Sequence, residues 1–193
     1  MNVKFYMNFK SVAYNLSESE FSDAYRNLEC RANDRETDLN QPLVNFMIQN
    51  IDKNSKTLLD IGCGRGYWLN KIADETDLEL TGCDLYDNVK LDKGKYIKSN
   101  IDNLPFEDNS FDIVTCHHTI EHVINPEKAI SELKRVTKKQ LILVTPCQRF
   151  FIYTLDLHLN FFPAEYNLTN LLRFKNYICK KVSGDWVYIG NKN

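Results

Sequence analysis

Gly62, Gly64 and Gly66 stand at every second position, directly after an apolar run, Leu58–Ile61, that carries Asp60. The run predicts a strand, and the helical spacing that begins after the third glycine predicts a helix. A glycine turn between them allows backbone N–H groups to approach a ligand closely, because glycine has no side chain to block the approach. The spacing differs from the G-x-G-x-x-G pattern of dinucleotide-binding loops. We therefore expect a ligand cradle of a different kind at this turn.

A second carboxylate, Asp84, follows Gly66 by 18 residues and comes directly after another apolar run, Leu78–Cys83. In nucleotide-binding α/β folds, a carboxylate at this place accepts hydrogen bonds from ribose hydroxyls. The glycine turn and Asp84 together predict a site for a nucleoside ligand.

Histidines cluster farther along the chain, where His117, His118 and His122 fall within six residues after a predicted strand, 111–116. Ligands of open α/β sheets bind beyond the carboxyl ends of the strands, so this cluster is expected to face the same crevice as the glycine turn. A histidine near its ordinary pKa is suited to general base catalysis. His118 and His122 are candidate bases, and a later loop supplies His158 as a third.

Two other interpretations of the cluster stay open. Glu121, His122 and His158 have the donor atoms of a divalent-metal site, to which His118 adds a further nitrogen. Alternatively, Glu121 and His122 hydrogen-bond the backbone and fix the wall of the crevice. The sequence therefore leaves three interpretations of this cluster open: a general base, a metal site, or residues that fix the wall of the crevice.

The segment Asp60–Gly66 resembles the first motif of class I S-adenosylmethionine-dependent methyltransferases, an acidic residue followed by G-x-G-x-G. Glu121–Val123 resembles the E-H-V segment of a subgroup, methyltransferase type 11, that includes ubiquinone-biosynthesis O-methyltransferases. The similarity covers roughly residues 57–146. It implies S-adenosyl-L-methionine as the cofactor. The cofactor-binding residues that it implies are Asp60, Gly62, Gly64, Gly66, Asp84, Leu85, Asn100, Ile101 and His117.

The segment Asn100–Phe106 is similar to a family segment that commonly reads D-A-x-x-L-P-F. This resemblance puts Asn100 at an acidic position that contacts adenine. Asparagine keeps a carbonyl acceptor for the adenine amino group but loses the charge. The backbone N–H of Ile101 is expected to face the ring, and Asp102 is a rival for the side-chain contact.

Strands and helices alternate through the middle of the chain, and a β-rich tail with a Ser183-Gly184 turn predicts an antiparallel hairpin. We expect one α/β domain over 1–193, with N-terminal helices in 1–55, a cofactor-binding core in 56–146, and an acceptor loop and hairpin in 147–193. The pattern predicts a mostly parallel sheet with an antiparallel C-terminal edge hairpin and helices on both faces. The resemblance implies the same Rossmann-like class I methyltransferase fold. The expected strands are 57–60, 79–83, 96–99, 111–116, 140–145, 177–182 and 185–189, and the expected helices are 17–30, 42–51, 67–75, 126–137 and 167–173.

Composition limits the partners. The formal net charge of −2 gives no electrostatic reason to expect a nucleic acid, and the longest aliphatic run is far too short to span a bilayer. Six cysteines without a C-x-x-C pair fit free thiols in a reducing compartment, so we expect a cytoplasmic location.

The predicted function is methyl transfer from S-adenosylmethionine to an oxygen of a small-molecule or glycan acceptor. Arg26, Arg31 and Arg35 stand in a region similar to methyltransferases of bacterial polysaccharide biosynthesis and are candidate contacts for a phosphate or sugar acid. An aromatic-rich segment, 149–163, forms an acceptor lid or packs against the N-terminal helices.

Two alternatives remain. One is methylation of the terminal ribose of an RNA, because small-RNA 2′-O-methyltransferases carry E-x-x-E-H and a later histidine, although His118 stands here in place of the first glutamate. The other is a non-catalytic methyltransferase-like partner subunit. The oligomeric state stays open.

Overall fold

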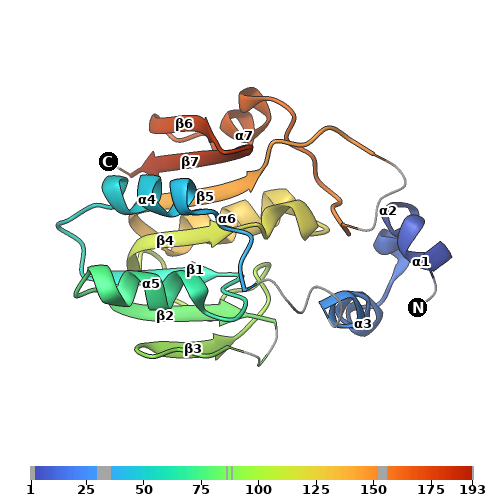
Figure 1. Ribbon diagram of the computed structural model, residues 1–193, viewed down its shortest axis with the longest axis horizontal. Coiled ribbons are helices and arrows are strands. Elements are labelled where there is room, and N and C mark those ends of the chain that lie inside the picture. The colour runs from blue at the N-terminus through green and yellow to red at the C-terminus, as the bar shows by residue number, and fades with distance from the viewer. Residues whose placement is uncertain (1–2, 30–35, 86, 88, 152–155, 193) are drawn as a thin grey trace.

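The computed structural model describes residues 3–29, 36–85, 87, 89–151 and 156–192. Its centre is one seven-stranded sheet with the strand order β3-β2-β1-β4-β5-β7-β6 (Figure 1). All seven predicted strands are confirmed, with ends that shift by one to three residues. Their bounds are β1 Thr57–Ile61, β2 Glu79–Asp84, β3 Lys95–Lys98, β4 Phe111–His117, β5 Thr137–Pro146, β6 Asn176–Val182 and β7 Asp185–Asn191.

Strands β1 to β5 run parallel, and β7 pairs antiparallel with both β5 and β6. The predicted edge hairpin is therefore confirmed. Ser183 and Gly184 form its two-residue turn with φ of 50° and 106°. A two-residue turn with two positive φ angles matches the right-handed twist of the strands that it joins.

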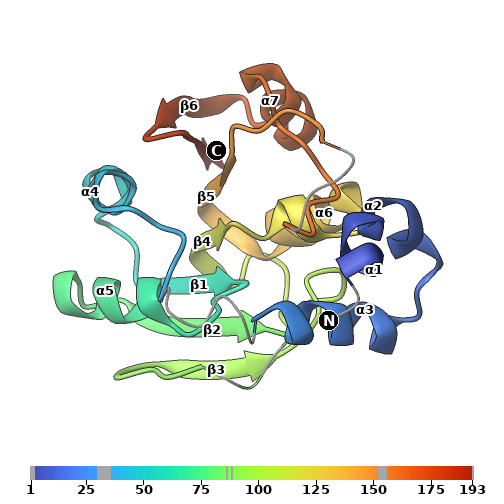
Figure 2. The same ribbon diagram turned by 45° about the vertical axis from the view of Figure 1, so that its right-hand side comes forward.

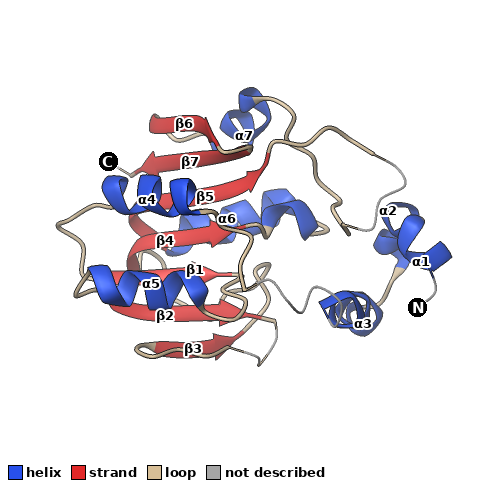
Figure 3. Ribbon diagram, viewed as in Figure 1, coloured by secondary structure: helices blue, strands red, loops and turns tan. Residues whose placement is uncertain are grey.

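Helices cover both faces of the sheet, as the alternating pattern predicted (Figures 2 and 3). Helices α4 (Gln41–Asn50) and α5 (Tyr67–Glu75) pack against one face, which includes Leu58. Helices α6 (Pro126–Val136) and α7 (Glu165–Leu172) pack against the other, which includes Leu59. The adjacent leucines point to opposite faces because side chains alternate along a strand.

Helix α6 ends one residue earlier than its sequence pattern predicted. Thr137 already pairs with Phe111 as the first residue of β5, and its hydroxyl donates to the carbonyl of Leu133. The side chain thus closes the last turn of the helix while the backbone enters the sheet. The apolar stripe alone contains no signal for a helix that passes into a strand without a loop.

The N-terminal helices lie beyond the carboxyl ends of the central strands (Figures 1 and 2). They are α1 (Val3–Met7), α2 (Phe9–Val12), the 3₁₀ helix η1 (Ala13–Asn15) and α3 (Glu18–Glu29). The predicted capping box of α3 is present, since Ser17 N–H donates to Glu20 and Glu20 N–H donates to the Ser17 hydroxyl. Phe9 and the distant Leu157 are fully buried in one cluster with these helices. This cluster covers the end of the sheet where ligands of α/β folds bind.

Candidate functional site

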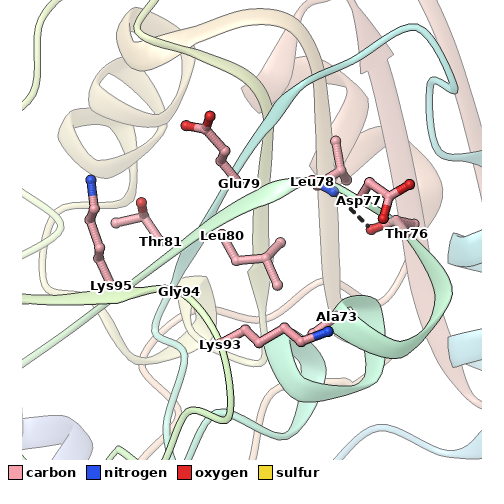
Figure 4. Close-up of a pocket in the computed structure, with 10 residues that line it drawn as sticks. All are labelled: Ala73, Thr76, Asp77, Leu78, Glu79, Leu80, Thr81, Lys93, Gly94 and Lys95. Atoms are coloured by element: carbon pink, nitrogen blue, oxygen red, sulfur yellow. Dashed lines mark hydrogen bonds between the residues drawn. The ribbon is translucent and has the colours of Figure 1, made fainter.

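A cleft of about 1570 Å³ lies between the carboxyl ends of the strands and α3. The loops after β1, β2, β3 and β4 line it, together with residues 156–158. This is the crevice that the sequence predicted, and its volume exceeds the ~1,000 Å³ of the largest ordinary ligand pockets. A second hollow of about 640 Å³, between the end of α5 and Lys93–Lys95, has none of the predicted site residues in its wall (Figure 4).

The three glycines of the β1–α5 turn all have positive φ but differ in their surroundings. A Cβ on Gly62 would lie 2.0 Å from the Thr119 hydroxyl oxygen, and one on Gly66 would lie 2.6 Å from a Leu91 methyl. A Cβ on Gly64 would meet nothing within 4 Å. Gly62 and Gly66 therefore permit close packing within the protein, whereas Gly64 faces open space in the cleft wall.

Asp84 stands at the end of β2, next to the glycine turn. Gly64 N–H donates to Asp84 Oδ2 over 2.8 Å, so the turn and the carboxylate are in direct contact. Leu85 follows on the same wall of the cleft. The arrangement puts a backbone donor and a carboxylate acceptor at one point, which suits a ligand that carries both an acidic group and hydroxyls.

Asp60 is buried at the end of β1, and its Oδ1 accepts a hydrogen bond of 2.7 Å from the Thr115 hydroxyl. Burial raises the pKa of Asp60 to about 8, and the nearby Asp84 carboxylate adds to this, although the Thr115 hydrogen bond opposes both. Asp60 therefore holds a proton over much of the neutral range.

His117, the last residue of β4, packs edge-on against Trp68, with 5.2 Å between ring centroids. Burial, together with the neighbouring His118, lowers the pKa of His117 to about 3. Within the described residues, its buried Nε2 has no hydrogen-bond partner. His117 is thus a neutral imidazole in the wall of the cleft, and its contact with the cofactor stays a prediction.

Asn100, Ile101 and Asp102 all line the cleft after β3. Asn100 Oδ1 accepts a hydrogen bond of 3.0 Å from Asp102 N–H. One lone pair of this oxygen, the predicted acceptor for the adenine amino group, is therefore used within the turn after β3. Burial raises the pKa of Asp102. Arg135 on α6 holds the following segment by donating to the carbonyls of Leu104 and Phe106.

The histidine cluster is assembled from two distant segments. Glu121 and His122 belong to the 3₁₀ helix η2 (Ile120–His122), and His158 comes from the loop after β5. One potential ligand atom from each of these three side chains lies within 4.8 Å of the others. The rings of His122 and His158 are 4.7 Å apart between centroids. The structure therefore brings together the three residues that the sequence proposed as metal ligands.

Burial lowers the pKa of His122, and it lowers the pKa of His158 to about 4. Glu121 is 1% exposed, and burial by itself would raise its pKa. The contacts with His118 and His122 outweigh burial and hold the pKa of Glu121 below its usual value. The cluster thus combines a buried carboxylate with two neutral imidazoles.

His118 lies beside the cluster, on the cleft wall. Its Nδ1 is 3.4 Å from Glu121 Oε1, and its Nε2 is 3.7 Å from Asp185 Oδ2 at the start of β7. Within the described residues, neither His118 Nε2 nor Glu121 Oε1 makes a hydrogen bond. The ring therefore stands between two carboxylates and can change partners without breaking a strong bond.

Four residues of the site were not predicted from the sequence: Tyr25, Gln148, Asp156 and Asp185. Tyr25 belongs to the apolar stripe of α3, where the spacing indicates packing and nothing more. The other three are isolated polar residues without a local pattern. The predicted arginine contacts at 31 and 35 lie outside the described residues, as does the side chain of Arg26.

The described part of the aromatic-rich segment packs against the N-terminal helices, as one of the two predictions had it, and the acceptor lid stays a prediction. Leu157 is fully buried against the N-terminal helices, whereas Asp156 and His158 line the cleft. The described cysteines are free thiols, at positions 63, 83, 116, 147 and 179. Among the described helices, none has the length and apolar character that crossing a bilayer requires.

Several known proteins resemble this chain in sequence or in fold. Residues 59–145 match the model of a family described as "Methyltransferase domain". The chain is 36% identical over 93 residues to demethylmenaquinone methyltransferase of Paenarthrobacter aurescens, a match that covers 45% of this chain and 36% of that protein. It is 33% identical over 97 residues to phosphoethanolamine N-methyltransferase 2 of Caenorhabditis elegans, covering 45% of this chain and 22% of the relative.

A solved S-adenosylmethionine-dependent methyltransferase of Thermotoga maritima has a similar fold, with a TM-score of 0.60 and 18% identity. The alignment covers 78% of this chain and 88% of that one. The chain spans less than half the length of the two curated relatives.

Proposed function

Because residues 59–145 form a class I S-adenosylmethionine-dependent methyltransferase domain, we propose that this chain transfers the methyl group of S-adenosylmethionine to an oxygen atom of a small-molecule acceptor. The observation that carries the proposal is that one cleft joins the open Gly64 backbone and Asp84 on one side with the histidine cluster on the other. A donor site and an acceptor site thus share one space.

The cofactor occupies the half of the cleft nearest β1 and β2. Gly64 would leave room for the methionyl carboxylate at the glycine turn, and Asp84 would hold the ribose hydroxyls. Gly64 N–H and Asp84, which hydrogen-bond each other here, would each contact the bound ligand. The adenine lies against Asn100 and Ile101, while Asp60, Leu85 and His117 complete the wall.

The acceptor occupies the half of the cleft nearest His118, His122 and His158. A lone pair of its hydroxyl oxygen attacks the methyl carbon, the carbon–sulfur bond breaks, and S-adenosylhomocysteine leaves as a neutral thioether. The hydroxyl must also lose a proton. We assign His118 as its acceptor, because Glu121 and Asp185 on either side stabilise the imidazolium that forms.

The names of the curated relatives support a small acceptor, since demethylmenaquinone and phosphoethanolamine are small molecules. The three histidines favour oxygen, because a hydroxyl requires proton removal before methylation. The end of a glycan or a sugar intermediate fits the same chemistry, and the free thiols of the described cysteines support a cytoplasmic reaction.

The test is transfer of a tritiated methyl group from S-adenosylmethionine to panels of hydroxylated and amine acceptors of similar size. We expect labelled ethers from hydroxylated acceptors and none from amines. Labelling of amines alone would overturn the assignment of oxygen while leaving methyl transfer intact. Binding of the cofactor without transfer to any acceptor in either panel would instead favour a non-catalytic partner subunit.

An RNA acceptor is the second candidate, because Glu121, His122 and His158 lie together and resemble the residues that small-RNA 2′-O-methyltransferases carry. A gel-shift titration with short RNA at low salt separates the two. Retardation that weakens with added salt would favour RNA, since phosphate contacts release counterions. Unretarded RNA in the presence of S-adenosylhomocysteine would leave the small-molecule acceptor.

A further inference from the structure

Glu121, His122 and His158 form a cluster in which hydrogen bonds hold one polar atom of each side chain. We propose that these three side chains bind a divalent transition-metal ion at the acceptor end of the cleft. One potential ligand atom from each residue lies within 4.8 Å of the other two, a spacing that a single ion can bridge with small adjustments.

The ring of His122 is fixed through its Nδ1. Tyr25 Oη lies 2.9 Å from this nitrogen and also 3.0 Å from the carbonyl oxygen of Leu157. A carbonyl only accepts, so the single tyrosine proton goes to Leu157 and Nδ1–H of His122 donates to the tyrosine oxygen. This tautomer leaves Nε2 with a bare lone pair.

The ring of His158 is fixed in the same way. Its Nδ1 contacts Gln148 Oε1, and the amide nitrogen of Gln148 donates to Asp156 Oδ2 over 2.9 Å. The carboxylate only accepts, so the amide oxygen must face the histidine and Nδ1 must carry the proton. Here too Nε2 keeps its lone pair. A histidine that binds a metal through one ring nitrogen usually donates the N–H of its other ring nitrogen to an oxygen, which is the arrangement of both histidines here.

Glu121 offers the third ligand. Its Oε2 accepts a hydrogen bond of 3.2 Å from the Thr145 hydroxyl, while its buried Oε1 lies 3.4 Å from His118 Nδ1 but has no hydrogen-bond partner within the described residues. An unsatisfied carboxylate oxygen in a buried position is costly. A bound cation would remove that cost.

The two segments that carry the ligands are locked to each other. The carbonyl oxygen of Glu121 accepts from the N–H groups of both Leu159 and Asn160, at 2.7 and 2.9 Å. The Asn160 side chain donates to the carbonyls of Ile120 and Val123 on either side of the ligand pair. The backbone therefore fixes the distance between the ligands before any ion arrives, which a binding site needs and a plain wall does not.

Two imidazoles and one carboxylate are ligands for Zn²⁺, Co²⁺, Mn²⁺ or Fe²⁺, whereas Mg²⁺ prefers oxygen and water. Three protein ligands leave coordination positions open, and His122 and His158 line the cleft. If the proposed methyl transfer is correct, an open position takes the acceptor oxygen. The ion lowers the pKa of that hydroxyl, its proton passes to His118, and the oxygen attacks the methyl carbon as above.

The experiment is a titration of chelator-treated protein with Co²⁺, followed by visible absorption and calorimetry, without cofactor or acceptor. We expect one equivalent to bind with a spectrum of nitrogen and oxygen ligands. A near-ultraviolet thiolate band would instead assign the ion to a cysteine and overturn the proposal. Failure of folded wild-type protein to bind Co²⁺ would also overturn it.

Variants locate the ion. Glu121→Gln and His158→Ala are expected to abolish the one-equivalent binding. The control is Glu127→Gln, an exposed carboxylate in the first turn of α6, which is expected to bind as wild type does. Tyr25→Phe, which removes the partner of His122 Nδ1, is expected to weaken binding about 10- to 100-fold. Unchanged binding by folded His158→Ala would refute the site even if Glu121→Gln does not fold.

The titration contains neither methyl donor nor acceptor, so its result is independent of the proposed reaction. Where an acceptor is known, a chelator is expected to slow methyl transfer and added Co²⁺ to restore it. Metal binding with transfer that a chelator leaves unchanged would refute the role in the acceptor reaction but not the site.

Discussion

Replacing Gly64 by valine separates ligand binding from folding. A Cβ at this position would meet no atom within 4 Å, so the side chain enters the cleft without a clash in the protein. Its φ of +53° lies in the left-handed region, where a residue with a side chain costs about 1–2 kcal/mol. For a domain of this size, that cost lowers Tm by roughly 2–8 °C. The variant is therefore expected to fold.

Binding of S-adenosylmethionine is expected to suffer far more. The valine occupies the space through which the methionyl carboxylate reaches the Gly64 N–H. A hydrogen bond to a charged group contributes about 1.5–3 kcal/mol, so its loss weakens affinity by about 10- to 100-fold, and steric overlap adds to this. Isothermal titration calorimetry with S-adenosylhomocysteine measures the change in Kd.

The matched control is Gly184→Val in the turn between β6 and β7. Gly184 also has positive φ, and a Cβ there meets nothing within 4 Å, but the turn does not line the cleft. This variant is expected to lose stability and to keep the wild-type Kd. Wild-type affinity in folded Gly64→Val would refute the placement of the cofactor at the glycine turn.

Three further outcomes follow from the site. Asp84→Asn exchanges a charged acceptor for a neutral one and is expected to weaken S-adenosylhomocysteine binding about tenfold in calorimetry; unchanged Kd would exclude a ribose contact. His118→Asn is expected to slow single-turnover methyl transfer at least about 100-fold without changing Kd, and a rate that stays within a few fold would exclude it as the base. Asp60, with a pKa raised to about 8, binds its proton more tightly in the folded than in the unfolded chain, so the free energy of unfolding is expected to fall as pH rises from about 4 to 8. Urea denaturation at pH 5 and pH 8 measures this change in the free energy of unfolding, and Asp60→Asn is expected to reduce the difference between the two pH values. An equal difference in the wild-type and variant proteins would show that Asp60 does not titrate in this range.

The fold was largely predictable because its elements carry local signals. Helix α5 spans Tyr67–Glu75 as predicted, since a glycine turn precedes it and its apolar residues recur at helical spacing. Helices α1 and α2 were not predicted. They have five and four residues, too few for a periodic pattern, and the burial of Phe9 in a tertiary cluster stabilises them.

The site was predictable where motifs are contiguous and not where they depend on distant contacts. The glycine turn, Asp84 and the histidines after β4 stood out in the sequence, and the structure places them around one cleft. Tyr25 reaches His122 across 97 residues of sequence. The fixing of His158 by Gln148 needs the loop geometry, which no spacing rule encodes.

The placement of a methyl donor in the cleft is tested most directly by calorimetric titration of the folded chain with S-adenosylhomocysteine at two temperatures, which guards against an enthalpy near zero at one of them. We predict saturable binding with one ligand per chain. Absence of heat at both temperatures, from protein whose circular dichroism shows a folded sheet and helices, would contradict the assignment of this cleft as a cofactor site.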